Sequence, residues 1–268
     1  MSCIAINQLL PALASHDVQL ALTTRIGSPQ ADEPAPRREL RAAEQLFALD
    51  VLFPLVERAG LPPVNRYLTF REIEQHDGIA VVSLPNPNTG DGLVALRAFA
   101  PDLVVSIRYG AIFKSPAIAV PPLGILNLHA GLLPAYRGVL ATFRALMAGE
   151  REIGCTLHYI TDGTIDTGPV IGTSPIAVDP TRSLLWNVVA LYPPAIAMMS
   201  DAIARVTRGE PLPVHAQSGG NYYTYPNAAE WDEFLRRGWR VADPSDLREI
   251  ALRFMPHADA PRPPNATA

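Results

Sequence analysis

The stretch GILNLH, residues 124–129, combines the apolar character of a buried strand with two polar side chains. Side chains alternate between the two faces of a strand, so Asn127 and His129 point to one side, about 6.5–7 Å apart, while the leucines point to the other. A helical pattern at 138–148 follows, with a glycine at its end. A strand, a turn and a helix in this order form the basic unit of α/β proteins.

The same unit recurs on the N-terminal side of this stretch. Short apolar runs of strand length stand at 18–24, 79–84 and 103–107. Helical spacing of apolar residues marks 2–16, 39–58 and 91–100. Helices that alternate with short apolar strands predict an α/β fold with a mostly parallel sheet and flanking helices. The chain begins with a helix, so the first strand that is usual in such folds is either absent or lies upstream of Met1.

The pattern changes after Gly154. Two further strands are predicted, at 155–161 and 169–178, on either side of the polar segment TDGTIDTG. A long helix at 182–208 follows, and we expect Pro193 and Pro194 to kink it. We expect residues 1–208 to form the main domain and 209–255, rich in proline and aromatic residues, to form a small C-terminal appendage. Residues 256–268 offer nothing to pack and are expected to be disordered.

Charge and composition narrow the class of protein. The formal net charge of -4 and a single lysine, Lys114, predict no nucleic-acid partner, because phosphate binders normally present a basic face. Cys3 and Cys155 are far apart and lack zinc-site spacing, so we expect no metal and no disulfide, and a cytoplasmic location. We find neither a secretory signal nor an unbroken apolar span of about 18 residues, and predict no membrane association.

Two polar segments could carry chemistry. Asn127 and His129 stand at the end of a strand, where open α/β sheets bind ligands, and polar groups buried there need partners or a function. The segment TDGTIDTG adds two carboxylates, Asp162 and Asp166. A carboxylate near an imidazole raises the pKa of the imidazole and orients its ring. An amide and a protonated imidazole can stabilise an oxyanion while a carboxylate relays a proton, so the set suits acyl transfer.

Three short motifs follow one another along the chain in a characteristic order. Asn127-Leu128-His129 is followed by GLLPAYRG at 131–138 and then by Asp166-Thr167-Gly168. The order resembles the formyltetrahydrofolate-dependent formyltransferase family, in which Asn-x-His, a Leu-Leu-Pro-x-Tyr/Trp-Arg-Gly element and Asp-x-Gly recur. The interval between the histidine and the aspartate is slightly longer than is usual in the family. The likeness covers roughly residues 79–208.

The resemblance implies a Rossmann-like catalytic domain that moves a formyl group from 10-formyltetrahydrofolate to an amine without a metal. It implies that Asn127 and His129 polarise the formyl carbonyl and hold the developing oxyanion. Asp166 would orient His129 and mediate proton transfer. The pterin of the donor would lie against the residues that match the family's folate pocket: Arg108, Tyr109, Gly110, Ile112, Phe113, Thr161, Asp162 and Gly163.

Other polar residues keep two interpretations. His158 lies within an apolar strand pattern, which favours a structural role. Arg137 could bind a substrate anion or brace the turn that contains it. Arg108 follows a strand end and is similarly open, with the ligand site favoured. The tyrosines at 222–225 could stack on an acceptor, although packing within the appendage is favoured.

The acceptor is the least defined part of the prediction. The resemblance disfavours methionyl-tRNA, because family members that use it carry a larger, basic C-terminal domain and the segment after residue 208 is short and not basic. It also disfavours glycinamide ribonucleotide, because members that use it are shorter and begin with a strand and a glycine-rich phosphate loop, which this sequence does not show. We therefore predict a small-molecule amine acceptor, an amino sugar nucleotide or a hydroxyornithine-like amine. The alternatives are a formyltetrahydrofolate hydrolase and a non-catalytic folate- or metabolite-binding protein. No oligomeric state is predicted.

Overall fold

The computed structural model of the chain describes residues 1–23 and 32–256, so the predicted disorder of the C-terminal tail falls almost wholly outside the described residues. The α-helices are α1 (Ser2–Leu9), α2 (Ala35–Arg41), α3 (Phe53–Ala59), α4 (Phe70–Asp77), α5 (Gly90–Phe99), α6 (Ser115–Ile118), α7 (Ala141–Ala148), α8 (Leu184–Ala190), α9 (Tyr192–Thr207), α10 (Ala228–Arg236) and α11 (Pro244–Leu252). A 3-10 helix, η1 (Leu10–Leu13), and a π-helix, η2 (Ala42–Leu52), extend α1 and join α2 to α3. The strands are β1 (Gln19–Leu22), β2 (Ala80–Ser83), β3 (Val104–Ile107), β4 (Ile125–His129), β5 (Tyr136–Gly138), β6 (Glu152–Ile160), β7 (Val170–Ala177) and β8 (Asn221–Tyr223).

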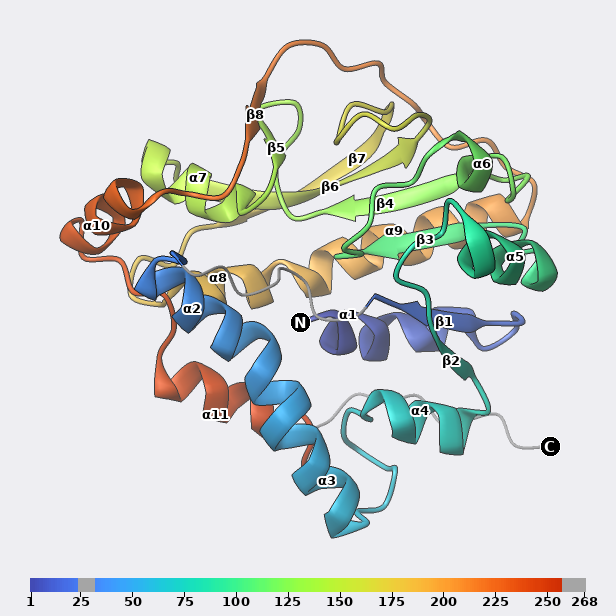
Figure 1. Ribbon diagram of the computed structural model, residues 1–268, viewed down its shortest axis with the longest axis horizontal. Coiled ribbons are helices and arrows are strands. Elements are labelled where there is room, and N and C mark those ends of the chain that lie inside the picture. Colours follow the sequence, from blue (N-terminus) through green and yellow to red (C-terminus); the bar gives the residue numbers. More distant parts are fainter. Residues whose placement is uncertain (24–31, 257–268) are drawn as a thin grey trace.

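Within the described residues, the strands form one sheet of four and two pairs. The four-stranded sheet has the order β3-β4-β6-β7, in which β3 and β4 are parallel while β6 and β7 run antiparallel to their neighbours. Two further parallel pairs are β1 with β2 and β5 with β8. Figure 1 shows α9 along one side of the four-stranded sheet and α1 close to α9. The predicted α/β class is confirmed.

The core lies between the four-stranded sheet and the long helix α9. Leu126 and Leu128 of β4 are buried, as the alternation of the strand requires, and they share one apolar cluster with Ile196 and Met199 of α9. Because this cluster holds β4 rigidly from one face, the side chains on the opposite face are presented in a fixed geometry. Those side chains are Asn127 and His129.

Two helices have bounds that differ from those predicted from the sequence. The helix predicted at 39–58 begins earlier, at Ala35, because a proline in the first turn is well suited to a helix start, and it continues through η2 and α3 until Gly60 closes it in the left-handed conformation. The helix predicted at 182–208 is two helices, α8 and α9, divided at Leu191, two residues before the first proline.

Helix α4 has no counterpart in the sequence prediction. Its first turn carries a capping box in which Thr69 accepts a hydrogen bond from the backbone of Glu72 and the Glu72 carboxylate accepts one from the backbone of Thr69. The same carboxylate receives two N–H groups of Arg66, which is 1% exposed. The start of α4 is therefore fixed by one buried ion pair as well as by its cap.

The stretch Leu184–Thr207 meets the length and mean hydropathy of a membrane-spanning helix, which the sequence analysis did not expect. In the described structure 56% of its apolar window is buried inside the molecule. The apolar residues of α8 and α9 therefore contribute to the core described above.

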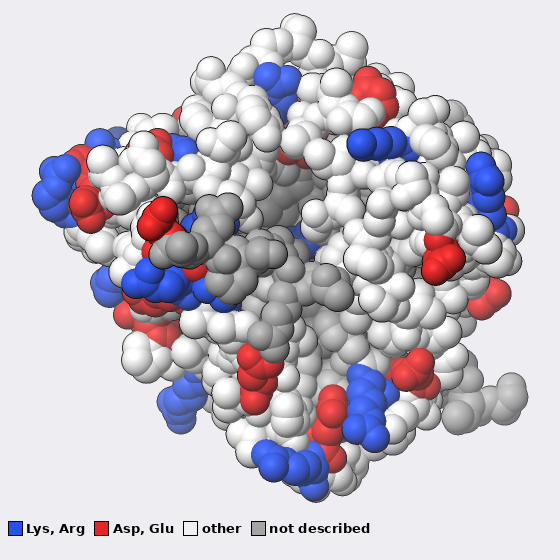
Figure 2. Space-filling model, viewed as in Figure 1, with Lys and Arg blue, Asp and Glu red and all other residues white. Residues whose placement is uncertain are grey.

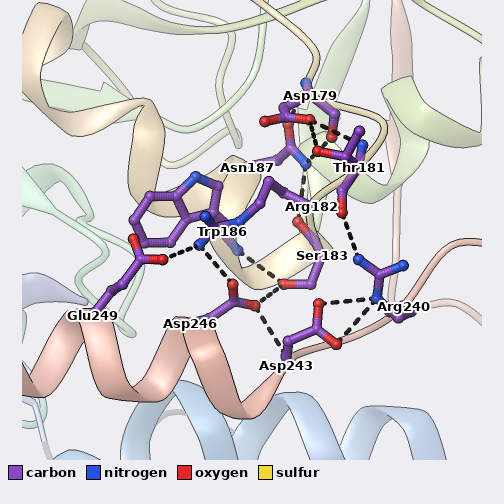
Figure 3. A network of polar contacts seen from close by, with 10 residues as sticks. All are labelled: Asp179, Thr181, Arg182, Ser183, Trp186, Asn187, Arg240, Asp243, Asp246 and Glu249. Carbon is purple, nitrogen blue, oxygen red and sulfur yellow. Dashed lines mark hydrogen bonds and ion pairs between the residues drawn. The ribbon is translucent and has the colours of Figure 1, made fainter.

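The C-terminal helices pack on the main body. Trp231 and Phe234 of α10 contact the ring of Phe143 in α7, with ring centroids 4.5 and 4.8 Å apart. Helix α11 is tied to the start of α8 by the polar network of Figure 3, at whose centre the fully buried carboxylate of Asp246 accepts hydrogen bonds from Arg182 and Ser183. These contacts join residues 228–252 to the same core as α7 and α8.

Candidate functional site

One cavity of about 580 Å³ contains all three of the predicted catalytic side chains. Asn127 and His129 reach it from β4, and Asp166 reaches it from the loop between β6 and β7. Figure 2 shows a hollow on the face that Figure 1 views. The structure therefore brings this strand end and this loop together at one cavity.

His129 is held at both ring nitrogens. Its Nε2 lies 2.7 Å from the carbonyl oxygen of Tyr136, and its Nδ1 lies 3.4 Å from Asp166 Oδ2. Because a carbonyl oxygen only accepts hydrogen bonds, Nε2 carries a hydrogen and donates it. The nitrogen that faces the carboxylate, Nδ1, is therefore the one that is free to take up or release a proton.

The carboxylate of Asp166 is fixed by its own backbone and by its neighbours. Its φ of 55° lies in the left-handed region, which is uncommon for a residue with a side chain and is typical of functional sites. The backbone N–H of Gly138 donates to Oδ2 at 2.8 Å, and Gln217 donates to the backbone carbonyl of Asp166 at 3.1 Å. The carboxylate therefore meets His129 in a preset orientation.

His158, which the sequence analysis took as structural, belongs to this site. It is 1% exposed, and β6 pairs with β4 so that His158 lies directly opposite Asn127. Its Nδ1 lies 2.9 Å from the carbonyl oxygen of Tyr159 and so carries a hydrogen. In the neutral ring, Nε2 then accepts a hydrogen bond from Asn127 Nδ2, 3.0 Å away. His158 therefore fixes which end of the Asn127 amide faces the cavity.

A pair of substitutions separates this orienting role from packing. His158→Leu removes the acceptor, so we expect kcat for the reaction proposed below to fall about tenfold while the KM for the donor changes little, because a misplaced polar group costs rate rather than binding. His158→Gln retains an acceptor oxygen and should recover most of that loss. Steady-state kinetics and thermal melting of both variants give the comparison. Equal loss in both, in step with lower stability, would assign His158 to packing alone.

The charges of the site are set by burial and by these contacts. Burial lowers the pKa of His129, and the nearby carboxylate of Asp166 opposes this without reversing it. Burial would raise the pKa of Asp166, but its contact with the His158 ring, its electrostatic interaction with the His129 ring and the N–H of Gly138 outweigh burial, and the pKa of Asp166 is lowered. At neutral pH the site therefore pairs a neutral imidazole with an ionised carboxylate.

The predicted folate-facing residues divide into those that line the cavity and those that do not. Most of them line it: Arg108, Tyr109, Gly110, Ile112, Phe113 and Asp162. The rings of Tyr109 and Phe113 stack with centroids 5.2 Å apart, and the hydroxyl of Tyr109 donates to the carbonyl of Leu84. Thr161 and Gly163 are exposed residues of the same loop that do not line the cavity.

Arg108 takes part in an ion pair at the cavity wall. Its Nη2 lies 2.8 Å from Glu44 Oε2, and it adopts a φ of 53° just after β3. Burial opposes the charge of this guanidinium, but the attraction of Glu44 outweighs burial and raises its pKa. A further ion-paired group, which the sequence analysis did not single out, lines the same cavity: Glu33, Arg37 and Arg41. Within residues 1–23 and 32–256, no cluster of three His, Cys, Asp or Glu side chains is arranged to hold a metal ion.

An α/β fold that gathers an amide, two imidazoles and a carboxylate at the end of a buried strand defines a site suited to acyl transfer. Residues 88–185 match the model of the formyl transferase family, and this segment contains all four of these side chains. Over these residues the chain is similar to the formyl transferase family.

Curated relatives share this sequence similarity, and a solved structure shares the fold. The chain is 37% identical over 203 residues to a methionyl-tRNA formyltransferase from Halorhodospira halophila, which covers 73% of this chain and 63% of that protein. It is 39% identical over 100 residues to the enzyme of the same name from Kosmotoga olearia, covering 37% of this chain and 32% of the relative. The fold is similar to that of glycinamide ribonucleotide transformylase 1 from Symbiobacterium toebii, with a TM-score of 0.51 and 20% sequence identity. The match covers 81% of this chain and 90% of that protein.

These comparisons correct one prediction. The absence of a nucleic-acid partner, which was predicted from net charge and the single lysine, is contradicted because the curated relatives are enzymes named for a tRNA substrate. Net charge describes the whole surface and does not report a local site, so it was too coarse a measure. The chain spans between about a third and about two thirds of the length of these relatives.

Proposed function

We propose that this chain transfers a formyl group from 10-formyltetrahydrofolate to an amine, with Asn127, His129 and Asp166 as its catalytic set. The observation that carries the proposal is the meeting of these side chains in one cavity, with His129 Nδ1 3.4 Å from Asp166 Oδ2. The three residues stand at the positions of the family's Asn-x-His and Asp-x-Gly motifs.

The cavity has features that suit a folate. Its volume falls in the range of sites for small organic ligands, and the stacked rings of Tyr109 and Phe113, with Ile112 beside them, offer a flat apolar wall. The side chains of Asp162 and Thr164 add polar groups on the loop that borders the same space. We assign the pterin of 10-formyltetrahydrofolate, which supplies the formyl carbon, to this wall.

The catalytic roles follow from the donor and acceptor atoms of each side chain. One N–H of the Asn127 amide is taken by His158, which leaves the second for the formyl oxygen as negative charge develops there. The neutral His129, beside the ionised Asp166, accepts at Nδ1 the proton that the attacking amine loses as its nitrogen bonds to the formyl carbon. The His129 imidazolium so formed helps to stabilise the negative charge on the formyl oxygen. The imidazolium then gives its proton to the folate nitrogen when the bond between that nitrogen and the formyl carbon breaks. The products are a formamide and tetrahydrofolate.

Two kinds of acceptor are compatible with this chemistry. One is the amine of a small metabolite, such as an amino sugar nucleotide or a hydroxyornithine-like amine. The other is the α-amine of methionyl-tRNA, the substrate for which the curated relatives are named. Both present a primary amine or hydroxylamine nitrogen to the same carbon, so the catalytic residues alone do not select between them.

The proposal is tested by following 10-formyltetrahydrofolate in the presence of each acceptor class. We expect tetrahydrofolate to appear together with a formylated amine, and His129→Ala to abolish both products while tetrahydrofolate still binds. Consumption of the donor in water alone, at a rate that no amine improves, would instead identify a hydrolase. Folate binding without turnover across methionyl-tRNA, amino sugar nucleotides and hydroxylated amines would contradict catalysis and identify a binding protein.

A further inference from the structure

The segment between α9 and β8, residues 209–220 and here called the strap, contacts the loop that carries the proposed catalytic carboxylate. His215 forms a backbone bridge with Val170, the first residue of β7. Two residues further on, Gln217 contacts the loop itself. Figure 1 shows the strap, in orange, arching from the end of α9 over the sheet to β8. The strap lies outside residues 88–185, so the similarity to the formyl transferase family does not account for it.

The side-chain amide of Gln217 holds this loop at two points. Its Nε2 donates to the carbonyl oxygen of Asp166 at 3.1 Å and to the carbonyl oxygen of Gly168 at 2.6 Å. An amide NH2 group has two N–H donors, so both donors of Gln217 are used. One side chain of the strap therefore clamps the backbone on either side of Thr167.

The backbone that Gln217 clamps has an unusual shape. Asp166 adopts a φ of 55°, which is costly for a residue with a Cβ atom. Gly168 packs so closely on β6 that an added Cβ atom would lie 1.8 Å from the carbonyl oxygen of Tyr159. A turn of this kind persists only where its surroundings hold it in place. The two hydrogen bonds from Gln217 contribute to that hold.

We propose that Gln217 is a positioning residue for Asp166, because it fixes the turn at 166–168 so that the carboxylate stays within reach of His129. The inference rests on the proposed function, in which Asp166 serves proton transfer at His129. Asp166 Oδ2 lies 3.4 Å from His129 Nδ1 and 2.8 Å from the backbone nitrogen of Gly138, and a small shift of the turn breaks both contacts. Gln217 does not line the cavity, so its effect on the reaction passes through Asp166.

Gln217→Met and His215→Gln are a matched pair of variants on the strap. Methionine keeps the length of glutamine but donates no hydrogen bond. We expect kcat for formyl transfer to fall between about tenfold and a hundredfold in Gln217→Met, with little change in the KM for the donor, because displacement of a catalytic group by about 1 Å has effects of this size. His215 is exposed and bonds Val170 through its backbone, so His215→Gln should keep the wild-type kcat. A wild-type kcat in Gln217→Met would overturn the proposal.

A second variant, Gln217→Glu, makes the same hydrogen bonds depend on pH. An ionised carboxylate has no donor, whereas a protonated carboxyl group has one O–H that can donate to one of the two carbonyl oxygens. We expect the ratio of its kcat to the wild-type kcat to rise as the pH is lowered from about 8 to about 5, since a carboxyl group that faces two acceptors favours its protonated form. Dividing by the wild-type value removes the titration of His129. A ratio that does not change with pH would contradict a role for these hydrogen bonds.

A double-mutant cycle tests whether Gln217 acts through Asp166. In the Asp166→Asn background the carboxylate that Gln217 positions is already gone, so we expect Gln217→Met to lower kcat by less than about twofold. Residues that act independently would instead give losses that multiply. Multiplied losses would assign Gln217 to general packing of the strap and refute its positioning role.

Hydrogen exchange at one backbone amide reports the place of Asp166 without any turnover. The N–H of Gly138 donates to Asp166 Oδ2, so we expect its exchange to speed up at least about tenfold in Gln217→Met, while the amides of β4 and β6 keep their wild-type rates. Unchanged protection at Gly138 would sink the idea. Faster exchange there, in a protein that transfers no formyl group to any acceptor, would refute the proposed function and leave the clamp on the turn standing. Formyl transfer at equal rates by Gln217→Met and the wild type would do the reverse.

Discussion

Asp166→Asn is expected to lower kcat/KM for formyl transfer about a thousandfold, because proton transfer by a positioned group contributes on the order of 10²–10⁴ to a rate. The variant keeps an oxygen that can accept the N–H of Gly138, so the loop should hold its shape. It loses the negative charge beside His129 Nδ1. Thermal melting close to that of the wild type would show that the loss is chemical and not structural.

The pH dependence of kcat/KM reports how the charge of Asp166 acts on the pKa of His129. Burial lowers the pKa of His129, so the acid limb of kcat/KM should lie below the ordinary histidine value of about 6.5. The carboxylate of Asp166 partly counteracts burial by favouring the imidazolium. Without that charge the pKa of His129 falls further, and the acid limb of Asp166→Asn should move to lower pH. A limb that stays in place, or moves upward, would show that His129 is not the group whose protonation controls the rate.

The positions of the proposed catalytic residues could be inferred from the sequence because they depend on local rules. Alternation along β4 places Asn127 and His129 on one face whatever the rest of the chain does. Asp166 lies in a polar, glycine-containing loop that could not be core. The capping box of α4, by contrast, was readable from Thr69 and Glu72 but was not recognised.

The remaining parts of the site depend on strand register, which carries no local signal. His158 contacts Asn127 because β6 runs antiparallel to β4 and places the two residues opposite one another. A shift of one residue would turn His158 to the other face, so only the pairing reveals its role. Tyr222 reaches the cavity because β8 pairs with β5, which lies more than eighty residues earlier in the chain. The division of the chain at residue 208 into a main domain and an appendage stays a prediction.

Asp246→Ala is a test of that division as well as of stability. The carboxylate of Asp246 is fully buried and accepts hydrogen bonds from Arg182 at 2.9 Å, from Ser183 Oγ and from the backbone of Asp243 at 2.9 Å (Figure 3). Its removal leaves buried donors without their acceptor, and loss of one partner from a buried charged network typically costs about 3–5 kcal/mol. For a chain of this size we expect a fall in Tm of roughly 10 °C.

The matched control is Glu249→Ala, because Glu249 pairs with the same arginine at 3.1 Å but has a side chain that is 40% exposed. Exposed pairs contribute about 0–1 kcal/mol, so this variant should melt within a few degrees of the wild type. Since Trp231 and Phe234 pack directly on Phe143, damage at Asp246 should lower a single cooperative transition. An early separate transition in calorimetry, with the formyl-transfer site still intact, would instead establish residues 209–255 as an independently folding appendage.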